Sequence, residues 1–80
     1  MILKISNLPL DVDSETLRQL VSQFGTVLSA DVITDKFNGY SKGFGFVKMK
    51  TLTDGFNVIA NLHGLELKGQ ALQVHEKLND

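Results

Sequence analysis

The sequence predicts an α+β fold of βαββαβ order, in which a four-stranded antiparallel sheet carries two helices on one face. Two segments place apolar residues at helical spacing, and four short segments are rich in β-branched or aromatic residues. Turn-forming residues separate these segments. Each helix has one apolar stripe and the sheet needs one cover, so both helices must pack on the same face. The other face of the sheet is left to solvent.

Composition limits the classes of protein that the chain can belong to. Its 80 residues suffice for a single domain, residues 1–80, with one small core. The absence of cysteine excludes a disulfide framework and a thiolate nucleophile, which suits a reducing compartment. The first residues have neither the cationic leader of a signal peptide nor the apolar length of a membrane span. We therefore expect a soluble, cytoplasmic and monomeric protein.

The first half of the chain reads as a strand, a helix and a strand. Residues 2–6 form the first expected strand, and Asp13 is a suitable N-cap for the helix that follows. Gly25 is expected to end this helix. Residues 27–34 form the second strand, although their apolar residues do not alternate strictly. The helical stripe consists of Leu17, Leu20, Val21 and Phe24, and the core side of the second strand consists of Val27, Ala30 and Val32.

The second half repeats this organisation with a hairpin and a second helix. Residues 35–41 contain Asn-Gly and connect the second strand to a third strand, residues 42–49. A helix begins after Thr51 or Thr53 and ends before Gly64. Residues 65–74 then form a small hairpin and lead into the last strand. The second helical stripe consists of Gly55, Val58, Ile59 and Leu62, and the last strand buries Leu72 and Val74.

The stretch "KGFGFVKM", residues 42–49, combines two aromatic residues with lysines at strand spacing. Successive side chains of a strand alternate between faces, so Phe44 and Phe46 share a face with Lys42 and Lys48. Although the net charge is −1, residues 36–53 hold four lysines and no acidic residue. Exposed rings among cations are typical of proteins that stack the bases of a single strand and neutralise its phosphates.

The octamer resembles the signature of the RNA recognition motif family at every position except the last, Met49. The family's hexamer is similar to "LKISNL", residues 3–8, and the resemblance covers essentially the whole chain. It implies a ferredoxin-like sandwich that binds single-stranded RNA, or single-stranded DNA, without a cofactor. It also implies that Phe46 stacks on a base, that Phe44 packs between two sugars and that Lys42 pairs with a phosphate. Lys48 would hold the backbone.

One position departs from the family pattern, because the second residue of the hexamer is Lys4 where an aromatic residue is usual. The missing ring removes stacking of about 1–3 kcal/mol per base. We therefore expect weak binding, roughly micromolar, with modest sequence preference. Lys4 either contacts the RNA or is a solvated strand residue, and the sequence leaves both open. Asp31, on the open face, would repel phosphate.

Other residues have a binding role and a structural role open to them. Phe37 and Tyr40, in the loop before the octamer, either add stacking or serve the structure, and we favour the structural role for both. His75 is in phase with the open face and either reads base edges or is a solvated strand residue. His63 and His75 lack further ligands nearby in the sequence, so we predict no metal site.

Two other classes of function were compared with RNA binding. A protein-interaction module of the same fold would use its helices, with Phe56 as an anchor, but we predict that Phe56 packs into the core beside Gly55. Acylphosphatase-like enzymes share the order of elements, but their glycine-rich arginine loop has no counterpart here. The only arginine of the chain, Arg18, lies on a helix. We therefore predict that the protein is not an enzyme and resembles small single-domain RNA-binding proteins of bacteria and organelles.

Overall fold

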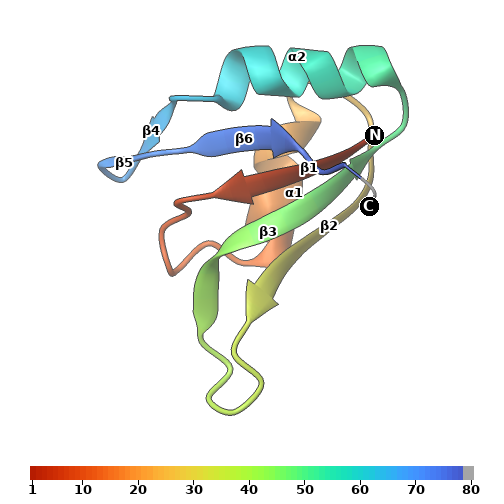
Figure 1. Ribbon diagram of the computed structural model, residues 1–80. Coiled ribbons are helices and arrows are strands. Elements are labelled where there is room, and N and C mark those ends of the chain that lie inside the picture. Colours follow the sequence, from red (N-terminus) through yellow and green to blue (C-terminus); the bar gives the residue numbers. More distant parts are fainter. Residues whose placement is uncertain (79–80) are drawn as a thin grey trace.

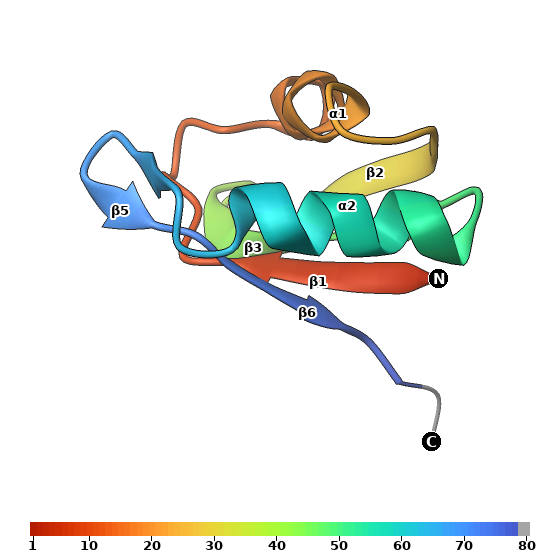
Figure 2. The same cartoon turned by 90° about the horizontal axis from the view of Figure 1, so that it is seen from above.

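The computed structural model describes residues 1–78 and confirms the predicted order of elements. The elements are β1 (Ile2–Ser6), α1 (Ser14–Ser22), β2 (Val27–Thr34), β3 (Ser41–Met49), α2 (Leu52–Leu62), β4 (Glu66–Leu67), β5 (Gln70–Ala71) and β6 (Gln73–Glu76). Within these residues, one antiparallel sheet has the strand order β2-β3-β1-β6, and β4 and β5 form a separate hairpin. Figure 1 shows α1 behind the sheet and α2 above it, and Figure 2 shows both helices on the same side of β1, β3 and β6.

Strict alternation along β1 separates the core from the solvent face. Leu3 and Ile5 are fully buried, whereas Lys4 between them is exposed. β1 lies between β3 and β6, so its core side chains meet those of both neighbours, Val47 and Val74 among them. The central position of β1 thus holds Lys4 in the middle of the solvent face.

Helix α1 begins at the predicted cap but ends earlier than predicted. The Asp13 carboxylate accepts a hydrogen bond from the Thr16 N–H at 2.8 Å, which satisfies one free donor of the first turn. The helix ends at Ser22, and Phe24 lies beyond it while still packing against the core. Gly25 is needed for close approach, because a Cβ there would lie 2.9 Å from the Cβ of Asp54.

Strand β2 explains why the apolar residues of this segment do not alternate. The pairing with β3 shifts register between Val27 and Ser29, as at a β-bulge, so Val27 and Ala30 both reach the core side. The free edge of β2 faces α1. There the Ser14 hydroxyl accepts from the Val32 N–H at 2.9 Å, and the Arg18 guanidinium donates to the Val27 carbonyl at 3.4 Å.

Helix α2 has Thr51 as its N-cap, which decides between the two predicted starts. The Thr51 hydroxyl accepts from the Asp54 N–H at 3.0 Å. The prediction that Phe56 packs into the core is wrong, because its side chain is 56% exposed. The space beside Gly55 is filled by the side chain of Met1, whose sulfur would collide with any Cβ at this position.

The last strand is held on both of its sides. Leu72 and Val74 are buried as predicted, and β6 pairs with β1. On its free edge, the Val74 N–H donates to Nδ1 of His63, the C-cap residue of α2, at 3.1 Å. The buried side chains among residues 1–78 are all apolar. No helix in this range combines the length and the apolar character that crossing a membrane requires.

Candidate nucleic-acid interface

The solvent face of the sheet presents its side chains in rows that run across the four strands. Residues paired in register across neighbouring strands lie on the same face. The central row therefore joins one residue from each strand, and a second row lies beside it. The central row is Asp31, Phe46, Lys4 and His75, and the second row includes Phe44, Ser6 and Gln73. The fold thus brings together residues that lie up to 71 positions apart in the sequence, as Lys4 and His75 do.

Phe44 and Phe46 meet edge to face on this surface. Their ring centroids are 5.9 Å apart, and the two planes form an angle of 85°. Both rings are half-buried. Perpendicular rings of this kind attract each other through the positive edge of one and the negative face of the other. A flat ligand can lie parallel to only one of these two planes at a time.

Lys4 covers one of the two rings. Its ammonium group lies 4.9 Å from the centroid of Phe44, within the range of a cation–π contact. Lys4 is also paired in register with Phe46 on one side and with His75 on the other. Its ammonium group therefore lies against the aromatic surface and does not simply extend into solvent.

The two lysines of the octamer lie at opposite ends of the aromatic pair. Lys48 is exposed and pairs with Ile2, one row beyond Phe46. Lys42 is exposed and precedes Gly43, whose positive φ of 78° turns the backbone at the start of β3. The Gly43 N–H is bonded to the hydroxyl of Ser41 at 3.0 Å. This conformation is the reason for a glycine at the second position of the octamer.

An open cavity of about 360 Å³ lies next to Phe44, where β1 and β3 meet the neighbouring loops. We call it the Phe44 pocket. It is lined in part by Lys4, Asn7, Leu10, Lys42, Phe44 and Gln70. The contributions of Leu10 and Gln70 could not be predicted from the sequence, because Leu10 lies in the β1–α1 connection and Gln70 in the two-residue strand β5, and neither segment is long enough for periodicity to carry information. The one available signal was a leucine within the turn segment "NLPLD", outside any apolar stripe.

The two aromatic residues of the β2–β3 loop are fully presented to solvent. Phe37 is 88% exposed and Tyr40 is 74% exposed, so the ring of Phe37 does not pack onto the edge of the sheet. The loop is shaped by polar groups instead. The Asp35 carboxylate accepts from the N–H groups of Phe37 and Asn38, and the Asn38 side chain accepts from the Tyr40 N–H. These Asx-type bonds hold the turn without either ring. The ammonium group of Lys36 lies 5.2 Å from the centroid of the Phe37 ring.

His75 lies on the solvent face, and His63 packs against it from the end of α2. The two ring centroids are 5.2 Å apart. Nδ1 of His63 accepts from the Val74 backbone, so its lone pair is already engaged. Within residues 1–78, no three histidine, aspartate or glutamate side chains come close enough together to hold a metal ion.

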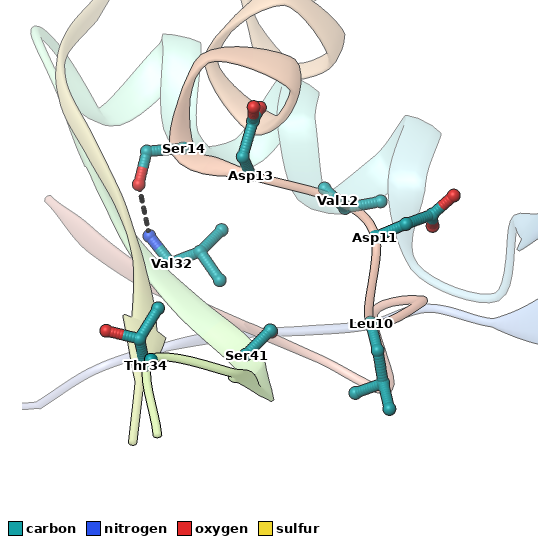
Figure 3. A pocket seen from close by; sticks show the side chains of 9 residues that line it. Leu10, Asp11, Val12, Asp13, Ser14, Val32, Thr34 and Ser41 are labelled. Atoms are coloured by element: carbon teal, nitrogen blue, oxygen red, sulfur yellow. Dashed lines mark hydrogen bonds between the residues drawn. The ribbon is translucent and has the colours of Figure 1, made fainter. Parts of the chain in front are cut away.

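A second cavity, of about 200 Å³, lies between the β1–α1 connection and the β2–β3 hairpin. In Figure 3 the carboxylates of Asp11 and Asp13 point away from Val32, whose N–H is bonded to Ser14. Both carboxylates have partners. The ion pair with Lys68 holds the pKa of Asp11 below its usual range, and the bond from the Thr16 N–H lowers the pKa of Asp13. No basic residue lines this cavity, so it offers no cation to an anionic ligand.

The fold and its exposed aromatic face define an α+β domain with a ligand-accessible sheet. The chain belongs to the RNA recognition motif family, whose sequence profile matches residues 3–73. It is 45% identical over 71 residues to the chloroplastic 28 kDa ribonucleoprotein of Spinacia oleracea, a match that covers 89% of this chain and 30% of that protein. The chain thus spans less than a third of the length of this relative.

Two solved structures show the same architecture. The crystal structure of RNA-binding protein PG1 superposes with a TM-score of 0.93 at 41% identity, covering 100% of this chain and 96% of that one. The Rna15 RNA recognition motif with bound RNA (GU) superposes with a TM-score of 0.89 at 26% identity, covering 98% and 83% of the two chains. The predicted ferredoxin-like fold is confirmed. Membership of this family also confirms the prediction that the domain is not an enzyme.

The expectation of a cytoplasmic protein is wrong. The similar plant proteins are chloroplastic or mitochondrial, among them the spinach ribonucleoprotein and a mitochondrial relative from Arabidopsis thaliana. The absence of cysteine, on which the expectation partly depended, does not distinguish the cytoplasm from these organelles.

Proposed function

We propose that residues 1–80 act as one RNA recognition motif unit that binds a short stretch of single-stranded RNA on the solvent face of the sheet and performs no chemistry. The observation that carries this proposal is the pair of half-buried rings, Phe44 and Phe46, set on an open face among three lysines. A face of this composition supplies the stacking surface and the cations that single-strand binding needs.

The two perpendicular rings contact different parts of the bound strand. Phe46 lies in the central row and stacks on one base, while Phe44 packs against the sugars of adjacent nucleotides. Since each base offers a π-face, stacking tolerates many sequences and contributes about 1–3 kcal/mol per base. His75, at the end of the central row, contacts a base edge, and the exposed rings of Phe37 and Tyr40 close over the strand from the loop.

The lysines supply the electrostatic part of binding. Lys42 and Lys48 lie at opposite ends of the aromatic pair and hold separate phosphates of the strand, with Lys4 between them. Two to four such contacts give a logarithmic salt dependence of roughly −1.4 to −2.8, at about −0.7 per phosphate of a single strand. Since Lys4 replaces a ring, the affinity is weak, roughly micromolar.

The similar proteins support RNA as the ligand. The spinach relative is named a ribonucleoprotein, and the Rna15 structure contains bound RNA. Single-stranded DNA shares the bases and the phosphates and lacks the 2′-hydroxyl. Titration with DNA of the same sequence therefore measures how much the sugar contributes.

An amide-resolved NMR titration with randomised short RNA at low salt tests the proposal directly. We expect shifts at Lys4, Phe44, Phe46 and the loop of residues 35–41. Phe46→Ala should weaken binding by about 1–3 kcal/mol without unfolding the domain. Phe56→Ala is the matched control, because it removes an exposed phenylalanine from the opposite side of the molecule. Equal affinity of the Phe46→Ala variant and the wild type would remove the sheet from the mechanism.

A protein-interaction role for α2 is the second candidate. Leu52 and Phe56 are 60% and 56% exposed and stand one helical turn apart, which places two large apolar side chains side by side on the surface. Such a pair is typical of a contact surface. An RNA titration without shifts on the sheet would favour this role over RNA binding.

A further inference from the structure

The Phe44 pocket lies beside the aromatic pair of Phe44 and Phe46 and is lined by one of its two rings. With about 360 Å³ it lies in the range of roughly 300–1,000 Å³ that small ligands occupy. It opens where β1 ends and β3 begins, beyond the second row of the solvent face. Phe44 therefore belongs to both sites, because it pairs with Phe46 on the solvent face and also lines the pocket.

Leu10 gives this pocket an apolar wall that none of residues 1–78 covers. Its side chain is 70% exposed, although it belongs to a segment whose neighbours Leu8 and Val12 are buried. Leu10 lies beside the backbone of Gly43, since a Cβ built at Gly43 would be in ordinary van der Waals contact, at 3.6 Å, with a methyl group of Leu10. The backbone of the strand and the leucine thus form a surface on which a flat ring can pack.

The charge of the pocket suits an anion. Lys4 and Lys42 both line it, and none of its lining residues is acidic. The cavity of Figure 3 is lined instead by Asp11 and Asp13, which would repel a phosphate. The two cavities share Leu10 and differ in charge, so an anionic ligand is directed to the Phe44 pocket.

Two side-chain amides are fixed at the rim. The Asn7 side chain donates to the Ala71 carbonyl at 2.9 Å, and the Gln70 side chain donates to the Asn7 carbonyl at 3.1 Å. These bonds attach the β4–β5 hairpin to the end of β1 and hold both amides in place. Amides that are already ordered lose little entropy when they contact the polar edge of a base.

We propose that the Phe44 pocket binds one further nucleotide of the RNA strand, with its base against Leu10 and Gly43, its phosphate between Lys4 and Lys42, and its base edge at Asn7 and Gln70. This inference rests on the proposed function. The pocket lies beyond Phe44, at one end of the aromatic pair. Only one end of the bound strand can therefore reach it.

Oligonucleotides of defined length test the proposal. Affinities are measured by fluorescence anisotropy for a trinucleotide and for two tetranucleotides that carry the additional nucleotide at the 5′ or the 3′ end. We expect the wild type to bind one tetranucleotide roughly five-fold more tightly than the trinucleotide, and the other without such a gain. Leu10→Ala and Gln70→Ala should each abolish the gain and keep the affinity for the trinucleotide.

Matched controls are Leu52→Ala and Gln19→Ala, which remove an exposed leucine and an exposed glutamine from the helices and should retain the gain. Amide spectra of each variant establish that it is folded. A gain of equal size at both ends, or one that persists in both pocket variants, would overturn the pocket proposal alone. Absence of binding to every oligonucleotide by the folded wild type would instead overturn the proposed function. Phe46→Ala should weaken binding at all lengths.

Discussion

The ammonium group of Lys4 lies 4.9 Å from the centre of the Phe44 ring, in the place where most members of this family have an aromatic residue. The charge therefore occupies one face of the ring that the bound strand needs. Binding of RNA must displace this contact or include the ammonium group between the ring and the strand. In the proposed mode of binding, Lys4 would thus have two opposing effects on affinity, attraction of phosphate and competition for an aromatic surface.

Lys4→Tyr should strengthen RNA binding. The new ring adds a stacking surface of about 1–3 kcal/mol per base and uncovers Phe44, while the lost cation reduces the logarithmic salt slope by about 0.7 if Lys4 contacts a phosphate. The gain should be largest at moderate salt, where the lysine contributes least. Lys4→Met is the control, since it removes the charge without adding a ring. Calorimetric titrations at two salt concentrations separate these effects, and a tyrosine variant no tighter than the methionine variant would contradict the prediction.

Asp31→Asn should also strengthen RNA binding. Asp31 is paired in register with Phe46, so its carboxylate lies on the solvent face beside the proposed path of the phosphates. Removing one negative charge should increase the affinity by up to about five-fold at low salt, and the increase should shrink as salt screens the charges. Glu66→Gln makes the same charge change on the separate β4–β5 hairpin and should have a smaller effect. Equal effects of the two substitutions would show that only net charge matters.

Gly45→Ala and Gly55→Ala should have opposite effects on stability. A Cβ at Gly45 would lie 2.5 Å from the Asp31 carbonyl oxygen, and the paired backbone of β2 cannot move away. We expect a loss of about 1–3 kcal/mol in the free energy of unfolding. A Cβ at Gly55 meets only the flexible side chain of Met1, while alanine favours the helix by roughly 1 kcal/mol. Urea denaturation of both variants measures their free energies of unfolding. A Gly45→Ala variant more stable than the Gly55→Ala variant would contradict the prediction.

The cap of α1 should make stability depend on acid pH. The bond from the Thr16 N–H holds the pKa of Asp13 below its usual value of 3.8. A carboxylate whose pKa is lower in the folded state than in the unfolded state contributes fully above the unfolded value, and this contribution disappears as the pH falls through the folded value. Asp13→Asn caps the helix without titrating.

The two proteins are therefore compared by their urea midpoints at neutral pH and below about pH 3. The wild type should lose stability in acid relative to Asp13→Asn, and Asp13→Ala, which has no cap, should be the least stable at neutral pH. A constant difference between wild type and Asp13→Asn at both pH values would exclude the cap as the source of the acid sensitivity.

The sequence predicts the central fold because each strand and helix follows its own periodicity. Alternation places Lys4, Phe44, Phe46 and His75 on one face, and Asp13 identifies the start of α1. The errors arise where distant segments decide the outcome. Phe56 is exposed because the space beside Gly55 is filled by Met1, which lies 54 positions before Gly55 in the chain.

Loop residues show the same limit. The exposure of Phe37 depends on the carboxylate of Asp35, which holds the turn in place of the ring. The Phe44 pocket combines Leu10 with Gln70, which are 60 positions apart and have no shared pattern in the sequence. Long-range packing of this kind leaves no periodic signal from which a single sequence could reveal it.

The outer strands of the sheet, β2 and β6, influence whether the protein aggregates in concentrated solution. Outer strands normally present unpaired N–H and C=O groups that can recruit a strand from another molecule and begin aggregation. Here Ser14 and Arg18 bind one outer N–H and one outer C=O of β2, and His63 binds one outer N–H of β6. A neighbouring chain would first have to break these bonds before it could extend the sheet. The open face of the sheet is therefore bordered by edges that offer fewer free backbone groups to another chain.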